Sequence, residues 1–274
     1  MKRTTVFTIA FMLVGLLATA QKDFKKSLSG ISRVEIETGT SVKIIKGSGS
    51  EIVISDGCKD CGGDEDHNVE VSWEDENRGG KSEDDRAKGL KAVYATGEDN
   101  TGVGMFVETD GETLRIKDLK TFWKRKGLTI TLPATVALNI NTGSLGSATV
   151  SGWSSELEVN TSVGNIKLDN VTGPITAHSS TGAIDVIFGS VNQDAPISIS
   201  SSTGVIDVTL PTSTKASVEM KSTMGTVYTN FDLVKPRADG LKALNEKAIS
   251  GDLNNGGVKI SLKASTGNIY LRKK

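Results

Sequence analysis

The second half of the chain repeats a short pattern of alternating apolar and polar residues around a glycine. Apolar residues stand seven and five positions before the glycine and two and four positions after it, with Thr229 as the one exception. The glycines of the repeat are Gly164, Gly182, Gly204, Gly225 and Gly267. Alternation with a period of two is typical of strands that bury one face. Each repeat therefore predicts two short strands, and we expect the glycine between them to supply a positive φ or a close backbone approach at a corner.

The spacing of these glycines predicts a stacked architecture. Successive steps are 18, 22, 21 and 42 residues long, and we interpret the last as two units with Gly251 near its middle. A weaker copy of the pattern runs through Leu138, Ile140, Gly146, Ala148 and Val150. A unit of about 20 residues buries its apolar face only by stacking on copies of itself. The prediction is an all-β chain, a parallel β-solenoid with rungs of about 20 residues and two strands per rung.

An antiparallel β-sandwich is the alternative, because regular short strands separated by turn signals also suit that fold. The solenoid is favoured because the same residue types recur at the same offsets from each glycine, which a hairpin array does not require. Hydroxyl residues stand two positions before the glycines, namely Ser162, Ser180, Ser202, Thr223 and Ser265. In a parallel stack we expect them to form a hydrogen-bonded ladder along one corner.

The rest of the chain divides by its patterning. Strand-like alternation in residues 21–55 predicts N-terminal strands, either capping rungs or a separate capping sheet. Residues 56–100 interrupt it with an acidic, cysteine-containing insertion, most of it too polar to bury a core. Residues 101–274 form the predicted solenoid, with a further interruption at 234–246 that carries Pro236.

The first twenty residues predict export. Lys2 and Arg3 precede an apolar run, and Ala18-Thr19-Ala20 offers the small residues that a signal peptidase requires. Position 21 is Gln rather than Cys, so a lipid attachment site is not predicted there. A retained anchor is the alternative. We expect no integral membrane segment after cleavage, because no later apolar run is long enough to span a bilayer, and we expect the protein in the periplasm, at the cell surface or outside the cell.

Charge and composition limit the classes of molecule that the protein is expected to bind. Removal of residues 1–20 leaves 30 basic against 33 acidic residues, a net charge of −3. That balance argues against nucleic acid as a partner, since nucleic-acid binding needs a basic surface. Thirty glycines and an aromatic content of 5% fit an all-β chain with many turns.

Cys58 and Cys61 are the only cysteines in the sequence. In an exported protein the pair predicts a local disulfide. A zinc site formed by Cys58, Cys61 and His67 is a weaker alternative, because a fourth strong ligand is missing nearby. A calcium site in the acidic run at residues 60–66 is also disfavoured, because the run lacks the regular ligand spacing of a calcium loop.

We predict no catalytic residues and no cofactor. A serine nucleophile requires a base and a group that orients the base. The chain contains only two histidines, so its many serines do not indicate a catalytic triad. We interpret His178 as a polar residue of a rung. Trp73, Trp123 and Trp153 could each stack on a sugar ring, but a position in the core or at its rim suits each equally well.

Several segments resemble one family of exported proteins. Residues 163–166, 202–208 and 266–271 carry the core of the repeat, and residues 86–91, 99–102 and 251–274 are similar to exported members from Bacteroidetes. The chain resembles the DUF4097 family of bacterial adhesin-like β-repeat proteins, close to the head GIN domain group of auto-transporter adhesins. The resemblance implies a right-handed parallel β-solenoid outside the cytoplasm and supplies no catalytic residues.

Three functions are compatible with these patterns. The preferred hypothesis is a non-catalytic binding or scaffold module for a glycan, an envelope polymer or a protein. The alternative is a component of envelope-stress signalling. A carbohydrate-active enzyme is less favoured, since fold analogy is its main support.

Overall fold

The computed structural model describes residues 23–58, 61, 88–90, 93–94, 97–120, 127–233 and 248–274. Within these ranges the protein is all-β. Its strands are β1 (Asp23–Ser27), β2 (Arg33–Glu37), β3 (Val42–Gly47), β4 (Glu51–Asp56), β5 (Met105–Asp110), β6 (Thr113–Asp118), β7 (Leu128–Pro133), β8 (Ala137–Asn141), β9 (Ala148–Ser151), β10 (Leu157–Val163), β11 (Ile166–Val171), β12 (Ile175–Thr181), β13 (Ile184–Phe188), β14 (Ile197–Thr203), β15 (Ile206–Leu210), β16 (Ala216–Ser222), β17 (Val227–Thr229), β18 (Ala248–Leu253), β19 (Val258–Thr266) and β20 (Ile269–Lys273).

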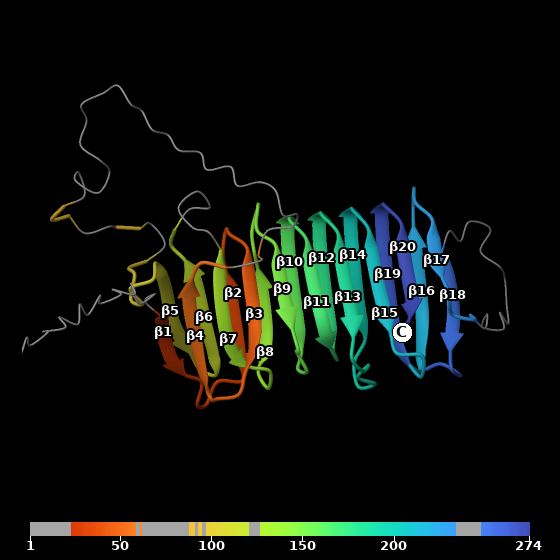
Figure 1. Cartoon of the computed structure of the whole chain (residues 1–274), viewed down its shortest axis with the longest axis horizontal. Coiled ribbons are helices and arrows are strands. Elements are labelled where there is room, and N and C mark those ends of the chain that lie inside the picture. The colour runs from red at the N-terminus through yellow and green to blue at the C-terminus, as the bar shows by residue number, and fades with distance from the viewer. Residues whose placement is uncertain are drawn as a thin grey trace, which may run out of the picture.

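The strands form two ten-stranded sheets that extend along the long axis of the molecule and face each other across one hydrophobic core (Figure 1). We call them sheet A, in the order β1-β4-β7-β3-β9-β11-β13-β15-β20-β17, and sheet B, in the order β18-β16-β19-β14-β12-β10-β8-β2-β6-β5. Each rung contributes one strand to each sheet, and the strands of neighbouring rungs pair in parallel. This arrangement confirms the predicted parallel β-solenoid and excludes the antiparallel sandwich.

The core consists of aliphatic columns between the two sheets. Ile166 pairs in register with Ile184, Ile184 with Ile206, and Ile206 with Ile269, and all four side chains are fully buried. On sheet B, Leu157 pairs in register with Ile175, and Ile197 with Ile260, and these side chains are also buried. Because side chains alternate across a strand, the intervening polar residues face outward, as the period of two predicted.

The rungs do not stack in chain order. Near the N-terminus, β2 lies between β6 and β8, and β3 lies between β7 and β9. Near the C-terminus, β19 lies between β14 and β16, and β20 lies between β15 and β17. The last rung of the sequence is therefore an internal rung of the solenoid, and the rung formed by β16 and β17 is displaced toward the end.

This order corrects our interpretation of the 42-residue step. Gly251 does not mark an additional corner, because it belongs to β18, which pairs antiparallel with β16 and ends sheet B. The surroundings of Gly251 also differ from those of the corner glycines. A Cβ added at Gly251 would lie 2.8 Å from the side-chain Cβ of Leu233, whereas one added at a corner glycine would meet the backbone of the neighbouring rung. The 42 residues from Gly225 to Gly267 therefore contain the capping strand β18 and a single step from one rung to the next, rather than two repeats.

The opposite end of the solenoid is also closed by antiparallel strands. In sheet A, β4 pairs antiparallel with β7 and β1 pairs antiparallel with β4, while β5 pairs antiparallel with β6 in sheet B. Strands β2 and β3 belong to a parallel rung, so residues 23–58 supply both a rung and a cap. At this end antiparallel strands cover the parallel repeat in both sheets, whereas at the other end sheet A finishes with β17, which pairs in parallel with β20.

Several predicted segments lie outside the described residues. These are the signal peptide at residues 1–20, most of the insertion at 56–100, and the interruption at 234–246. In the part of the chain that the structure describes, we find no helix with the length and hydropathy required to cross a membrane.

Candidate functional site

The corner glycines form one column along the solenoid. An added Cβ at Gly182 would lie 2.1 Å from the carbonyl oxygen of Gly164, and one at Gly204 would lie 2.0 Å from that of Gly182. The same approach occurs between Gly267 and Gly204 and between Gly225 and Gly267. No side chain fits between backbones at this distance, so the column sets how closely the rungs stack.

Buried hydroxyl groups line the inner side of this column. Thr161 Oγ1 donates to the carbonyl oxygen of Gly146 (2.8 Å), Ser179 Oγ to that of Gly164 (3.1 Å) and Ser201 Oγ to that of Gly182 (3.2 Å). These residues stand three positions before each glycine, whereas the residues two positions before it are exposed. The predicted hydroxyl ladder therefore exists at the neighbouring position, because alternation along the strand turns that position inward.

The cysteine pair lies in the described structure, while its proposed metal partner does not. Cys58 and Cys61 form a disulfide with their Cα atoms 5.6 Å apart. A disulfide offers no thiolate to zinc, which requires the deprotonated sulfur. His67 lies outside the described residues. An added Cβ at Gly127 would lie 2.8 Å from the Cβ of Cys58, so the disulfide packs directly against the start of β7.

The other side chains considered from the sequence are structural where they are described. His178 lies on the outer face of β12, and its Nδ1 is 2.9 Å from Ser200 Oγ on the adjacent strand β14. Trp153 is buried in the core. Trp73 and Trp123 lie outside the described residues. None of the described candidates offers an aromatic surface to a ligand.

Tyrosines at the end of sheet A provide the aromatic surface instead. The residues three positions after each corner glycine face outward and form a row across neighbouring strands: Lys167, Asp185, Asp207, Tyr270 and Tyr228. The rings of Tyr228 and Tyr270 stack with their centroids 5.1 Å apart and an interplanar angle of 9°. The sequence carried a signal for this pair, because both tyrosines occupy the same position of the repeat.

An ion pair fixes the inner tyrosine. Arg272 Nε donates to both carboxylate oxygens of Asp207 (2.8 and 2.9 Å), and its Nη2 donates to Oδ2 (2.8 Å). The guanidinium carbon of Arg272 also lies 5.2 Å from the centroid of Tyr270. Since β20 lies between β15 and β17, the guanidinium and Tyr228 contact Tyr270 from opposite sides. We call Tyr228, Tyr270, Arg272 and Asp207 the tyrosine–arginine patch.

A hollow of about 400 Å³ lies beside this patch. Its lining consists of Tyr228, Thr229, Asn230, Tyr270, Leu271, Arg272 and Lys273. Asn230 is held in place because its Oδ1 accepts a hydrogen bond from the backbone N–H of Lys273 (2.7 Å). The Lys273 ammonium lies 5.6 Å from the centroid of the Phe231 ring. The lining thus combines two aromatic rings, an amide and the guanidinium of Arg272, which is paired with Asp207. Lys273 is in register with the buried Leu210, so its side chain lies on the other face of β20.

Electrostatics along the row are asymmetric. Burial raises the pKa of the Asp185 carboxyl, and the charge of Asp207 raises it further, while Lys167 lowers it. The hydrogen bond from Arg272 to Asp207, together with the charge of that carboxylate, raises the pKa of the Arg272 guanidinium. Arg272 therefore neutralises Asp207, whereas repulsion between the two adjacent carboxylates contributes to the raised pKa of Asp185.

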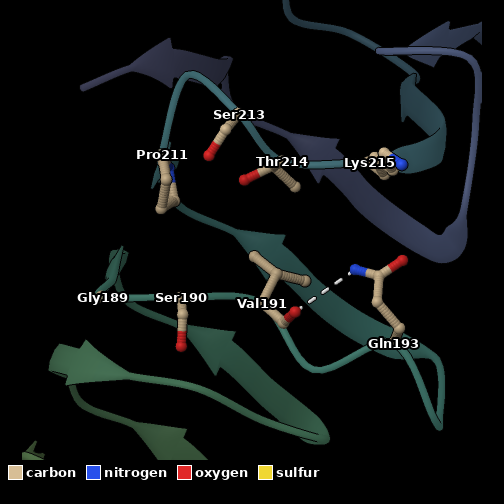
Figure 2. Close-up of a pocket in the computed structure, with 8 residues that line it drawn as sticks. All are labelled: Gly189, Ser190, Val191, Gln193, Pro211, Ser213, Thr214 and Lys215. Atoms are coloured by element: carbon tan, nitrogen blue, oxygen red, sulfur yellow. Dashed lines mark hydrogen bonds between the residues drawn. The ribbon is translucent and has the colours of Figure 1, made fainter.

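A second hollow, of about 310 Å³, lies between two turns at the opposite corner of the rungs (Figure 2). Val191 and the Ser213 hydroxyl face the space between the turns, while the Ser190 hydroxyl points away from it. Gln193 Nε2 donates to the carbonyl oxygen of Val191 (3.2 Å), and its Oε1 accepts from the N–H of Val258 (3.2 Å). The Gln193 amide thus stabilises the turns through these hydrogen bonds. We therefore take the tyrosine–arginine patch as the stronger candidate site.

Comparison with known proteins gives a family model and similar solved structures. The family model Toastrack DUF4097 matches residues 134–272. Similar solved structures include a "putative cell adhesion protein" from Clostridium sporogenes, with a TM-score of 0.47 and 12% identity over 93% of this chain and 100% of that chain. Another is a "putative adhesin" from Bacteroides fragilis, with a TM-score of 0.39 and 14% identity over 92% of this chain and 96% of that chain.

These structural similarities are too weak to carry a functional argument, and no curated protein matches the chain. The family match is of a different kind, because it covers just over half of the sequence and includes every repeat from Gly146 to Gly267. It also confirms the resemblance of the repeat segments to DUF4097. The protein is a member of the Toastrack DUF4097 family.

Proposed function

We propose that this protein is an exported, non-catalytic, adhesin-like module that binds a glycan of the cell envelope or its surroundings. Export is supported by the residues of the predicted signal peptide at 1–20, and the glycan by the surface chemistry of sheet A. The observation that carries the proposal is the tyrosine–arginine patch, an aromatic surface next to hydrogen-bond donors on the outside of the solenoid.

A rigid framework suits this function. The strands on either side of the patch are fixed by parallel pairing, from Ile206 opposite Ile269 to Thr209 opposite Arg272. Side chains held in register lose little conformational entropy when a ligand binds, so more of the contact energy remains as affinity. Tyrosine also has few rotatable bonds relative to its contact area, which favours its use in binding surfaces.

A glycan array tests the proposal. The mature chain, labelled on its α-amino group, should give signals on a defined subset of glycans, and these should weaken in the Tyr228→Ala variant. A Met224→Ala variant serves as the matched control, because Met224 is 78% exposed on the same rung but does not line the hollow. Absence of any glycan signal would contradict the proposal, including when a protein partner is captured from envelope extract.

Catalysis is checked with the same ligands. Any glycan that binds is incubated with the protein and then analysed by size-exclusion chromatography. We expect its chain length and composition to remain unchanged, and a shortened product would show that the module is an enzyme.

A further inference from the structure

The hollow between the two turns in Figure 2 is lined by a residue whose buried hydroxyl has no hydrogen-bond partner among the described residues. We infer that this hollow is a second binding site, which takes the acetamido group of an N-acetylated amino sugar. The choice of a sugar rests on the proposed glycan binding, whereas the site and the chemical group that it takes go beyond that proposal.

The hollow lies where the chain passes over a rung. The turn at residues 211–215 leads from β15 to β16, but β19 lies between β14 and β16 in sheet B, so this turn reaches past one rung. The turn at residues 189–194 leads to β14 on the other side. Gly257 packs between the two turns, since an added Cβ there would lie 2.6 Å from the carbonyl oxygen of Lys215 and 2.7 Å from Gln193 Oε1. The walls of the hollow are therefore fixed by tertiary packing.

Thr214 is satisfied along its backbone but not at its side chain. Its N–H donates to the carbonyl oxygen of Pro211 (3.0 Å), and its own carbonyl oxygen accepts from Asn254 Nδ2 (2.8 Å). The residue is 6% exposed, and its Oγ1 is buried without a hydrogen-bond partner in the part of the chain that the structure describes. A buried hydroxyl without a partner lowers stability. An acceptor on a bound ligand would remove that cost.

The Thr214 hydroxyl can reach such an acceptor because Thr214 lines the hollow. The two hydrogen bonds hold its backbone in place, and the side chain can change between staggered wells by rotation about χ1. In Figure 2 the hydroxyls of Ser213 and Thr214 both lie on the side of their turn that faces Val191. Two hydroxyls on one turn therefore converge on the space between the turns.

The rest of the lining favours a neutral group with an apolar end. Val191 and Pro211 supply the apolar surface. The amide of Gln193 is already engaged at both ends. No carboxylate belongs to this lining as described, and Lys215, its one charged residue, is exposed to solvent. A ligand in the hollow thus meets hydroxyl groups beside aliphatic carbon.

An acetamido group matches this lining part by part. Its carbonyl oxygen accepts from the Thr214 and Ser213 hydroxyls, and its methyl group packs against Val191 and Pro211. A sugar hydroxyl at the same position supplies a hydrogen bond but no apolar group. At about 310 Å³ the hollow lies at the lower end of the usual range for small-molecule sites, which begins at about 300 Å³. A folded protein domain would need a much larger contact surface.

Isothermal titration calorimetry on the mature full-length chain tests the inference. The probe is fully N-acetylated chitotriose, and cellotriose is the matched ligand with the same linkage and a hydroxyl in place of each acetamido group. We expect chitotriose to bind at least about tenfold more tightly. Thr214→Val should weaken chitotriose binding at least about fivefold. Its melting temperature without ligand should equal or exceed that of the wild type, because the new methyl group replaces a hydroxyl that had no partner.

Thr212→Val is the matched control in the same turn. Thr212 is exposed, does not line the hollow, and uses its Oγ1 to donate to the carbonyl oxygen of Lys274 (2.6 Å). This variant should bind chitotriose within about twofold of the wild type.

Three results would overturn the inference. These are equal binding of the two trisaccharides, wild-type affinity in Thr214→Val, and a melting temperature of ligand-free Thr214→Val clearly below that of the wild type, which would show that the hydroxyl stabilises the fold. Each of them leaves the proposed function standing if the array shows glycan signals that weaken in Tyr228→Ala. An array without any glycan signal would contradict the proposed function itself.

Discussion

A methyl group added to the glycine column should destabilise the solenoid strongly. In Gly204→Ala, the new Cβ would lie 2.0 Å from the carbonyl oxygen of Gly182 and 2.6 Å from its carbonyl carbon. Both contacts are with backbone atoms, so no side chain can rotate to relieve them. Gly204 also has a φ of 149°, which an alanine rarely adopts.

The magnitude follows from what must move. An acceptable Cβ contact requires the two backbones to separate locally by about 1 Å. That shift disrupts the hydrogen bond from Ser201 Oγ to Gly182 O (3.2 Å) and weakens the one from Gly182 N to Thr203 O (2.8 Å). Each lost bond costs about 1 kcal/mol, and the unfavourable φ costs about 1–3 kcal/mol. We expect a loss of about 4 kcal/mol, a large share of a typical stability of about 5–15 kcal/mol.

Urea denaturation followed by far-ultraviolet circular dichroism measures the loss. The matched control is Gly39→Ala, at the corner between β2 and β3, where an added Cβ would meet no heavy atom within 4 Å. That variant should change the free energy of unfolding by less than about 0.5 kcal/mol. If Gly204→Ala is no less stable than Gly39→Ala, the close stacking of the corners does not support the fold and the reasoning is wrong.

Three further predictions use the same logic elsewhere. Ile184→Asp should cost several kcal/mol in urea denaturation, because it buries an unpaired carboxylate in the aliphatic column, whereas Asp185→Ser should cost less than about 1 kcal/mol; equal losses would contradict the buried column. Burial raises the pKa of the Asp99 carboxyl, but hydrogen bonds from Thr101, Gly102 and Gly104 outweigh it, so the pKa lies below 3.8. This stabilisation is present above the ordinary pKa and is lost as the pH falls through the lowered one. The difference in unfolding free energy between the wild type and Asp99→Asn should therefore begin to narrow near pH 3.8 and close as the pH falls through the lowered pKa, and a constant gap would refute the assignment. Mass spectrometry of the exported protein should show an N-terminus at Gln21, and an intact Met1 there would exclude signal cleavage.

The local sequence was sufficient to predict the rung. Ile184 and Ile206 are fully buried and in register, as their equal offsets from Gly182 and Gly204 indicated. The reason is that strand alternation and the corner glycine are both local constraints, which act within a few residues of the chain. The inner hydroxyl ladder was missed by one position, although the same alternation could have placed Ser179 and Ser201 inside.

The order of the rungs was decided by the tertiary structure. Each rung presents nearly the same hydrogen-bonding edge to either neighbour, so the repeat pattern alone does not determine which rung stacks on which. The observed order places β20 between β15 and β17, and only this order brings Arg272 to Asp207 and stacks Tyr270 on Tyr228. Contacts between residues 42 and 65 positions apart in the chain depend on how whole rungs pack, and the candidate site depends on those contacts.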